Sequence, residues 1–304
     1  MRVAAIDCGT NSLRLLIADI DGNNFREVHR DMRVVRLGQG VDKNKAFAPE
    51  AIERTLAVTA EYAAILRSKG VEKIRFCATS ATRDATNRDL FIDGVRDILG
   101  ITPEVIPGSE EAALSFLGAT KELGQELSPF LVVDIGGGST EFVLGSTDVT
   151  SARSVNIGCV RMSERHLTVQ PPNAEQVVEA IVDIDAAILD ARSHVDFSAA
   201  QTLIAVAGTA TTVAAAALDL PDYDRYAIHL SRIPAAKVHE VAEMFASMTR
   251  DEIAALGYMH PGRVDVITSG SLVLSRVMTL TGAKEFVASE SDILDGIAWG
   301  LAKI

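Results

Sequence analysis

Two short loops rich in glycine and hydroxyl side chains are the part of the sequence best suited to chemistry. They are Asp7-Cys8-Gly9-Thr10-Asn11-Ser12 and Asp134-Ile135-Gly136-Gly137-Gly138-Ser139-Thr140-Glu141. Glycine lets the backbone approach an anion, so that successive N–H groups can donate to phosphate oxygens, and the hydroxyls add further donors. An aspartate does not bind phosphate directly, so Asp7 and Asp134 imply a bridging cation or water. The paired loops predict a site that grips a phosphate chain.

Apolar runs on both sides of each loop predict that the loop joins two strands. Strands are expected at 2–7 and 13–20 around the first loop, and at 130–134 and 141–145 around the second. A third strand should follow each pair, at 25–37 and 149–157. The two loops are separated by about one domain's length of chain, so the pattern indicates an internal duplication.

The remaining chain predicts alternating helices and strands, which is typical of an α/β protein. Helices are expected at 49–69, 87–99, 109–123, 173–194, 207–218, 234–248, 250–256, 264–281 and 291–303. Further strands are expected at 73–78, 104–106, 202–206 and 285–288, with loops at 79–86 and 219–233. The polar break at 124–129 predicts two domains, 1–125 and 126–304, with the option that the closing helix 291–304 packs back on the first.

Composition excludes several classes of partner. The 304 residues carry a net charge of −12, which disfavours a general surface for nucleic acid or for an anionic membrane. No apolar stretch reaches the roughly 20 residues that a membrane span requires, and no signal peptide is visible. Three cysteines without a CxxC motif are typical of reduced thiols. A cytoplasmic globular protein is therefore expected.

The motifs of the chain, taken in order, resemble those of the exopolyphosphatase/guanosine pentaphosphate phosphatase family within the actin-like ATPase superfamily. The matching segments are Asp7–Leu15, Ala78–Arg83, Gly108–Ala112, Asp134–Glu141, Gly158–Arg161, Gly208-Thr209 and Ala288–Gly296. The resemblance implies two actin-like (ribonuclease H-like) domains, each with a mixed sheet flanked by helices, and an active site in the interdomain cleft.

The residues that would bind phosphate come from three places. They are Gly9, Thr10, Asn11 and Ser12 of the first loop with Arg14 of the strand after it, Gly136, Gly137, Gly138, Ser139 and Thr140 of the second loop, and Gly208 and Thr209. The last two open a helix after a strand, which suits an anion or nucleoside contact but also a plain helix cap. Arg14 alternates with apolar residues and could simply face solvent. Asp7, Asp134 and Glu141 would hold Mg²⁺, with Mn²⁺ as the alternative.

Two residues are assigned to catalysis. Arg83 follows a strand in a Thr/Ser cluster, and the resemblance makes it a phosphate clamp rather than a solvated arginine. In the family, the second glutamate of the Glu110-Glu111-Ala112 motif is the base that orients water, which is Glu111 here. Acidic residues in a first helical turn are also common dipole partners, the interpretation kept for Glu110. A carboxylate at that position is expected to stay ionised, without a raised pKa.

The resemblance implies Mg²⁺-dependent release of orthophosphate from the end of inorganic polyphosphate. The alternatives are guanosine pentaphosphate (pppGpp) as substrate, an actin-like kinase, or an ATP-dependent filament or scaffold. Longer family members append a helical domain, so a chain ending at Ile304 is expected to prefer short polyphosphate. Family analogy also implies a homodimer, with the apolar segment Val264–Leu280 as a candidate face and core burial as its competing interpretation.

Overall fold

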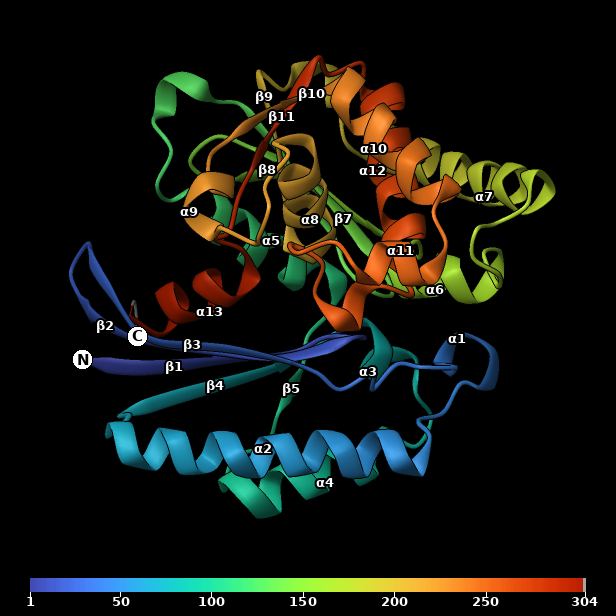
Figure 1. Ribbon diagram of the computed structural model, residues 1–304. Helices are drawn as coiled ribbons and strands as arrows, with labels where there is room; N and C mark the ends of the chain where they lie inside the picture. The colour runs from blue at the N-terminus through green and yellow to red at the C-terminus, as the bar shows by residue number, and fades with distance from the viewer. Residues whose placement is uncertain (303–304) are drawn as a thin grey trace. The chain divides into compact units, whose positions relative to one another are not determined.

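The computed structural model describes residues 1–302 and divides into two compact units (Figure 1). Unit 1 comprises residues 1–118 together with the helix that begins at Ile293, and unit 2 comprises residues 119–292. The helix expected at the end of the chain thus belongs with unit 1. The expected domain division after residue 125 stays a prediction about which parts fold independently.

Unit 1 is built on a five-stranded mixed sheet in the order β3-β2-β1-β4-β5. Its strands are β1 (Arg2–Cys8), β2 (Ser12–Asp21), β3 (Asn24–Val34), β4 (Lys73–Ala78) and β5 (Glu104–Val105). Its helices are α1 (Val41–Asn44), α2 (Pro49–Lys69), α3 (Ser80–Asp84), α4 (Arg88–Leu99), α5 (Gly108–Thr120) and α13 (Ile293–Ala302). The first three strands form an antiparallel meander, while β4 and β5 run parallel to β1.

Alternation along β1 explains why helices cover both faces of this sheet. Ala4 and Ile6 pack in one cluster with α2 and α4, which lie together on one side of the sheet (Figure 1). Val3 and Ala5 face the other way and pack with α5 and α13. Successive strand residues point to opposite faces, so an uninterrupted apolar strand requires two covers.

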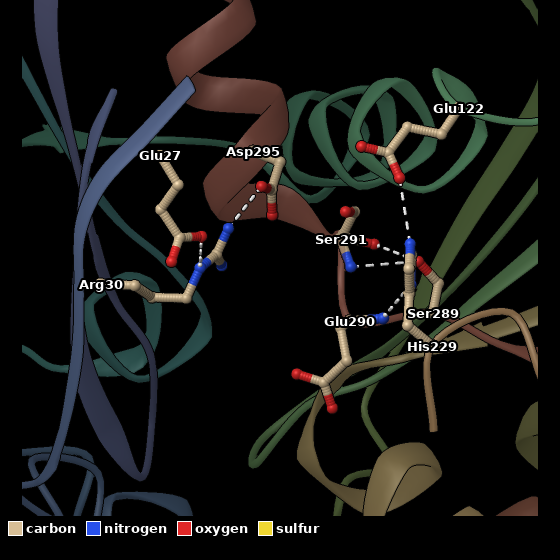
Figure 2. A network of polar contacts seen from close by, with 8 residues as sticks. All are labelled: Glu27, Arg30, Glu122, His229, Ser289, Glu290, Ser291 and Asp295. Atoms are coloured by element: carbon tan, nitrogen blue, oxygen red, sulfur yellow. Dashed lines mark hydrogen bonds and ion pairs between the residues drawn. The ribbon is translucent and has the colours of Figure 1, made fainter. Parts of the chain in front are cut away.

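The contacts of α13 are specific as well as apolar. Arg30 of β3 donates to Asp295 of α13 at 2.5 Å and to Glu27 at 2.8 Å, which Figure 2 shows. Gly296 lies so close to α5 that a Cβ there would be 1.9 Å from the Leu114 carbonyl oxygen. A glycine at this position is therefore what allows α13 and α5 to approach one another.

Unit 2 repeats the scheme on a six-stranded mixed sheet in the order β10-β11-β9-β6-β7-β8. Its strands are β6 (Phe130–Ile135), β7 (Thr140–Gly145), β8 (Val149–Val155), β9 (Thr202–Val206), β10 (Arg232–Pro234) and β11 (Glu285–Ala288). Its α-helices are α6 (Cys159–Arg165), α7 (Ala174–His194), α8 (Ala207–Ala217), α9 (Arg225–Ile228), α10 (Ala235–Ser247), α11 (Arg250–Ala254) and α12 (Ile267–Thr281). Short 3-10 turns lie at Gln125–Leu127, Phe197–Ala199 and Pro261–Arg263. Each glycine loop joins the first two strands of its meander, as the duplication predicted.

The structure departs from the expected elements where segments are short. The predicted loop 79–86 contains α3, and the predicted loop 219–233 contains α9 and the start of β10. Helices α1 and α6 were not expected. The third strand ends at Val34 rather than at residue 37, since the next residues turn back toward the first glycine loop. The segment Val264–Leu280 belongs mostly to α12, whose apolar side chains are buried in the core of unit 2. Core burial is thus the correct interpretation of that segment.

The chain passes from one unit to the other after Gly118 and after Asp292. Within unit 2, the imidazole of one histidine forms hydrogen bonds both near the start of this unit and near its end (Figure 2). The backbone N–H of Glu290 donates to Nδ1 of His229 at 3.1 Å, so the ring hydrogen lies on Nε2, which donates to Glu122 at 3.0 Å. His229 therefore fixes the spacing of these two segments within unit 2.

Two glycines of α13 provide a matched test of its packing. We expect Gly296→Ala to destabilise the protein by about 2 to 3 kcal/mol, because the new methyl group meets a backbone carbonyl that cannot rotate away. At Gly300 the added methyl group would make only an ordinary contact, 3.9 Å from Nη1 of Arg75, so Gly300→Ala should gain up to about 1 kcal/mol from helix propensity. Thermal unfolding of both variants measures the difference; equal midpoints would contradict the close contact.

Candidate active site

The second glycine loop, residues 136–139, has its carbonyl groups held on one side. The first two N–H groups of α6 donate to the carbonyls of Gly136 and Gly137 at 3.0 and 2.9 Å. Nε of Arg161 donates to the Gly138 carbonyl at 2.6 Å. In a planar trans peptide, an N–H points opposite to the carbonyl that precedes it. The N–H groups of the next three residues therefore point away from α6 together, and none of them donates to an acceptor within residues 1–302.

Gly158, the residue before α6, lets this arrangement form. A Cβ at Gly158 would lie 2.6 Å from the carbonyl carbon and oxygen of Gly137. Arg161, which reaches the loop from within α6, is itself buried. Successive N–H groups that point to one side of a loop can form a nest that binds an anion such as phosphate. The loop is thus shaped by a helix that sequence inspection did not predict.

The hydroxyl groups of this loop differ in their surroundings. The Thr140 hydroxyl donates its hydrogen to the Ile157 carbonyl at 2.7 Å, so that hydrogen is already used within the protein. Ser139 is buried and its side chain makes no hydrogen bond within residues 1–302. Of the two hydroxyls predicted to bind phosphate here, Ser139 is the one that has a hydrogen to offer.

The first glycine loop follows the same geometric rule. The carbonyls of Thr10 and Asn11 accept from backbone N–H groups of residues 35, 36 and 38, at 2.8 to 3.0 Å. The N–H groups that follow them are therefore turned to the other side of the loop. The Thr10 hydroxyl is buried and has no hydrogen-bond partner within residues 1–302. A buried hydroxyl without a partner is costly, which favours a ligand at this position.

The segment that braces the first loop was not predicted as part of the site. Gly38 approaches so closely that a Cβ there would be 2.4 Å from Cγ2 of Thr10 and 2.9 Å from Cβ of Ala81 in α3. Thr82, also in α3, has a second buried hydroxyl without a partner in the described chain. The run Gly38-Gln39-Gly40 was the only signal in the sequence, and it is too short to distinguish a brace from an ordinary turn.

The buried carboxylates lie at the ends of the central strands. Asp7 pairs in register with Arg14 across β1 and β2, and the Arg14 guanidinium contacts the Asp7 carboxylate at 2.6 Å. Arg14 is therefore held by an ion pair rather than left facing solvent. Asp134 and Glu141 are register partners across β6 and β7, both are buried, and Glu141 accepts from Ser154 at 2.6 Å.

This donor set fits Mg²⁺ on chemical grounds. Carboxylate oxygens are the ligands that Mg²⁺ prefers, and the ion usually takes one or two of them and completes its shell with water and phosphate oxygens. Among residues 1–302, no three His, Cys, Asp or Glu side chains gather closely enough to enclose a metal by themselves. The protein thus offers partial coordination, as expected for a cation that arrives with a phosphate substrate.

Arg83 and Glu111, the two residues assigned to catalysis, are in direct contact. Nη1 of Arg83 donates to the Glu111 carboxylate at 2.6 Å and to the Ile106 carbonyl at 3.0 Å. Glu111 is 8% exposed, and burial raises the pKa of its carboxyl, while the charge of Arg83 and its hydrogen bond lower it. The expectation that its pKa stays unraised was wrong, because burial outweighs the helix terminus.

Glu110, beside Glu111 in sequence, points to a different partner. Its carboxylate pairs with Arg75 of β4, which also binds Glu104. The two neighbours therefore differ in role: Glu110 belongs to a partly exposed ion-pair network, and Glu111 is buried against Arg83. The choice of Glu111 as the candidate base stays a prediction.

The N-terminus of α8 lies beside the second glycine loop, since β9 and β6 are parallel neighbours with Val206 opposite Asp134. A Cβ at Gly208 would lie 2.4 Å from the guanidinium of Arg263. Arg263 donates to Thr212 at 2.9 Å and lies over the Tyr223 ring, and it makes no ion pair with any carboxylate of residues 1–302. Sequence inspection missed Arg263, because its contacts are distant along the chain.

Comparison with known proteins identifies the family. A model of the Ppx/GppA phosphatase family matches residues 16–302. The chain belongs to this family. It is 48% identical over 314 aligned positions to Exopolyphosphatase 2 of Mycobacterium tuberculosis, and the alignment covers 99% of this chain and 98% of that protein. The family resemblance expected from the motifs is confirmed.

Solved structures of similar proteins agree with the fold. The crystal structure of an exopolyphosphatase-like protein matches with a TM-score of 0.96 at 45% identity, covering 100% of this chain and 99% of that one. An exopolyphosphatase from Cytophaga hutchinsonii matches with a TM-score of 0.91 at 25% identity, covering 100% and 98%. The expected α/β fold with two mixed sheets flanked by helices is confirmed. None of the helices within residues 1–302 combines the length and apolar character that a membrane crossing requires.

Substitution of Gly158 tests how the second loop is held. We expect Gly158→Ala to push α6 away from Gly137, to destabilise the protein by about 1 to 3 kcal/mol, and to weaken phosphate binding at least tenfold. Gly9→Ala is the control for stability, because a Cβ at Gly9 would be 3.7 Å from its nearest neighbour. Thermal unfolding and calorimetric titration with inorganic phosphate measure the two effects. Unchanged phosphate affinity in Gly158→Ala would contradict the proposed grip.

Proposed function

We propose that the protein is an exopolyphosphatase, which hydrolyses the terminal phosphoanhydride of inorganic polyphosphate and releases orthophosphate. The observation that carries the proposal is the buried Glu111–Arg83 pair, which combines a base for water with a cation for phosphate in unit 1. The relative at 48% identity is named Exopolyphosphatase 2, which supports the same substrate.

Phosphate binding is assigned within each unit to the backbone groups of its own glycine loop, with the Thr10 hydroxyl in unit 1 and the Ser139 hydroxyl in unit 2. Arg14 and Arg83 add positive charge near the first loop. Because a guanidinium can donate two parallel hydrogen bonds to a phosphate, Arg83 would hold the terminal phosphate while keeping its contact with Glu111. Positioning and electrostatics dominate phosphoryl transfer, so few further groups are required.

Glu111 would act as the base that orients water. The water oxygen bonds to the terminal phosphorus, the bridging P–O bond breaks, and its electron pair leaves with the shortened chain. The water proton passes to the Glu111 carboxylate, whose raised pKa makes it a better acceptor than an ordinary glutamate. Mg²⁺, or Mn²⁺, would be held in unit 2 by the register partners Asp134 and Glu141 and would neutralise negative charge on the phosphates.

A second candidate substrate, guanosine pentaphosphate, is favoured by one feature of unit 2. Arg263 and the ring of Tyr223 lie together beside Gly208 at the start of α8. A flat guanidinium and an aromatic ring next to a helix N-terminus suit a nucleoside and its phosphates. The chemistry would be unchanged, with a 5′-triphosphate in place of the chain end. A kinase or a filament-forming ATPase has no comparable support.

The proposed setting is the cytoplasm. Cys8, Cys77 and Cys159 are free and buried, and burial raises the pKa of each thiol, to about 12 for Cys77 and about 11 for Cys159. Such thiols stay protonated and serve packing rather than nucleophilic chemistry. This use of cysteine is typical of a reducing compartment.

A substrate panel tests the proposed function. Phosphate release is measured with Mg²⁺ from short polyphosphate, long polyphosphate, guanosine pentaphosphate and ATP, each with a chelator control. We expect hydrolysis of polyphosphate, little release from ATP, and loss of activity on chelation. Faster release from guanosine pentaphosphate than from either polyphosphate would select the second candidate. Release from ATP alone would overturn both.

The pH profile tests the Glu111–Arg83 pair. Because Glu111 must be ionised to accept a proton, kcat/KM should fall on the acid side with a limb above 4.5, the ordinary value for glutamate. Arg83→Gln removes a charge that lowers this pKa, so its limb should move to higher pH. Glu111→Gln should abolish the limb and most hydrolysis while leaving phosphate binding nearly intact. Wild-type turnover in Glu111→Gln would show that another group is the base.

A further inference from the structure

Arg75 of β4 connects three elements of unit 1 through one guanidinium. Its Nη2 donates to the carboxylate of Glu104 in β5 at 2.8 Å and to the carboxylate of Glu110 in α5 at 2.5 Å. Its Nε also donates to Glu104, at 3.1 Å. The Arg75 side chain is only 18% exposed, so most of it is packed within unit 1. Arg75 therefore attaches the first turn of α5 to the sheet.

The first turn of α5 carries both Glu110 and Glu111. The backbone N–H groups of the two residues both donate to the Pro107 carbonyl, at 3.0 Å each. Successive residues of a helix are rotated by roughly 100° about its axis, so the two carboxylates leave the turn in different directions. Glu110 reaches Arg75, and Glu111 reaches Arg83. Two ion pairs in different directions limit how far this turn can rotate or slide.

The segment that enters α5 is held at the end of the same strand. The Ile106 N–H donates to the carbonyl of Ala78, the last residue of β4, at 3.1 Å. Arg83 of α3 donates to the Ile106 carbonyl at 3.0 Å. The beginning of α5 thus lies against the end of β4, and Arg75 gives it a second point of contact further back along that strand.

Exposure argues against a purely stabilising role for the Arg75–Glu110 pair. The Glu110 side chain is 41% exposed, and an ion pair that water can reach contributes little to the free energy of unfolding. The position of a catalytic group matters more, because a displacement of about 1 Å can lower turnover by about 100-fold. The pair is therefore able to affect turnover far more than stability.

Given the proposed role of Glu111 as the base, we propose that Arg75 and Glu110 are positioning residues, which hold the Glu111 carboxylate where it orients water. Neither side chain needs to touch the substrate. Arg75 acts on Glu110 through their ion pair, and Glu110 acts on Glu111 through the helical turn that they share. Arg83 is then the direct partner of Glu111, and Arg75 sets the direction of the turn that carries it.

Steady-state kinetics with polyphosphate tests the positioning role. Arg75→Gln and Glu110→Gln should each lower kcat about tenfold with KM nearly unchanged, because neither variant alters a glycine loop. Both break the same contact, so the double variant should lose no more than either single variant. Arg75→Lys keeps a charge that can reach Glu110 and should recover most of the loss. Wild-type kcat in both single variants, while Glu111→Gln is inactive, would overturn the proposal.

Arg2→Gln is the matched control for the loss of an ion pair. Arg2 pairs with Asp19 at 2.7 Å at the start of β1, its side chain is 31% exposed, and its partners lie in β2 and at the end of α2. This variant should keep wild-type kcat, and thermal unfolding should show a loss of stability similar to that of Arg75→Gln.

The two single variants also separate position from charge. Arg75→Gln removes a positive charge and Glu110→Gln removes a negative one, so any direct effect of charge on the pKa of Glu111 must have opposite signs. Loss of position lowers kcat in both. Acid limbs that move in opposite directions, with both plateaus at the wild-type value, would overturn the proposal.

Amide hydrogen exchange reports on the turn itself, whichever group is the base. The N–H groups of Glu110 and Glu111 are protected by the Pro107 carbonyl, so both should exchange several-fold faster in Arg75→Gln. Arg2→Gln should leave their exchange unchanged. Wild-type exchange of both amides in Arg75→Gln would overturn the proposal even if the protein hydrolyses polyphosphate as expected.

Discussion

A planar peptide group cannot offer its C=O and its N–H to the same side, and the candidate site depends on this constraint. In the second loop, α6 and Arg161 bind the carbonyls of residues 136–138, and so the N–H groups of residues 137–139 are turned outward. In the first loop, the turn after β3 does the same for Thr10 and Asn11. Two unrelated segments thus solve one geometric problem, and each needs a glycine, Gly158 or Gly38, to come close enough. The donors are set before any ligand arrives, which lowers the cost of binding.

Burial sets the proton affinity of the Glu111–Arg83 pair, the other part of the candidate site. Glu111 is removed from water, which raises its proton affinity, while Arg83 keeps the ionised form accessible. A buried ion pair contributes little net stability, because desolvation offsets the attraction. The chemistry proposed for this pair gives a reason, other than stability, for its presence in unit 1. Glu110, one residue away, forms a partly exposed ion pair with Arg75 instead.

Local signals predicted much of this molecule. Pro49 and Gly70 define both ends of α2, and the two glycine loops defined the duplicated meander. Short helices such as α3 and α6 were not predicted, because so few residues cannot show the helical repeat of apolar side chains. Arg263 was missed because Thr212 and Tyr223 become its neighbours only through the fold. Sequence identified the loops and the Glu111 motif, but burial, and with it the raised pKa of Glu111, required three dimensions. The roles of the predicted site residues stay predictions.

The packing of α13 has a consequence for synthesis on the ribosome. Five of its side chains, Ile293, Leu294, Ile297, Ala298 and Leu301, help to cover Val3 and Ala5 of the first strand. The first strand is therefore synthesised long before α13, which is made only after all of unit 2. During translation, unit 2 can complete its own core while α13 is still missing from one face of the unit 1 sheet, which α5 covers only in part. Until α13 is made, the apolar side chains that it covers stay exposed, and such exposed surface makes a nascent chain prone to aggregation.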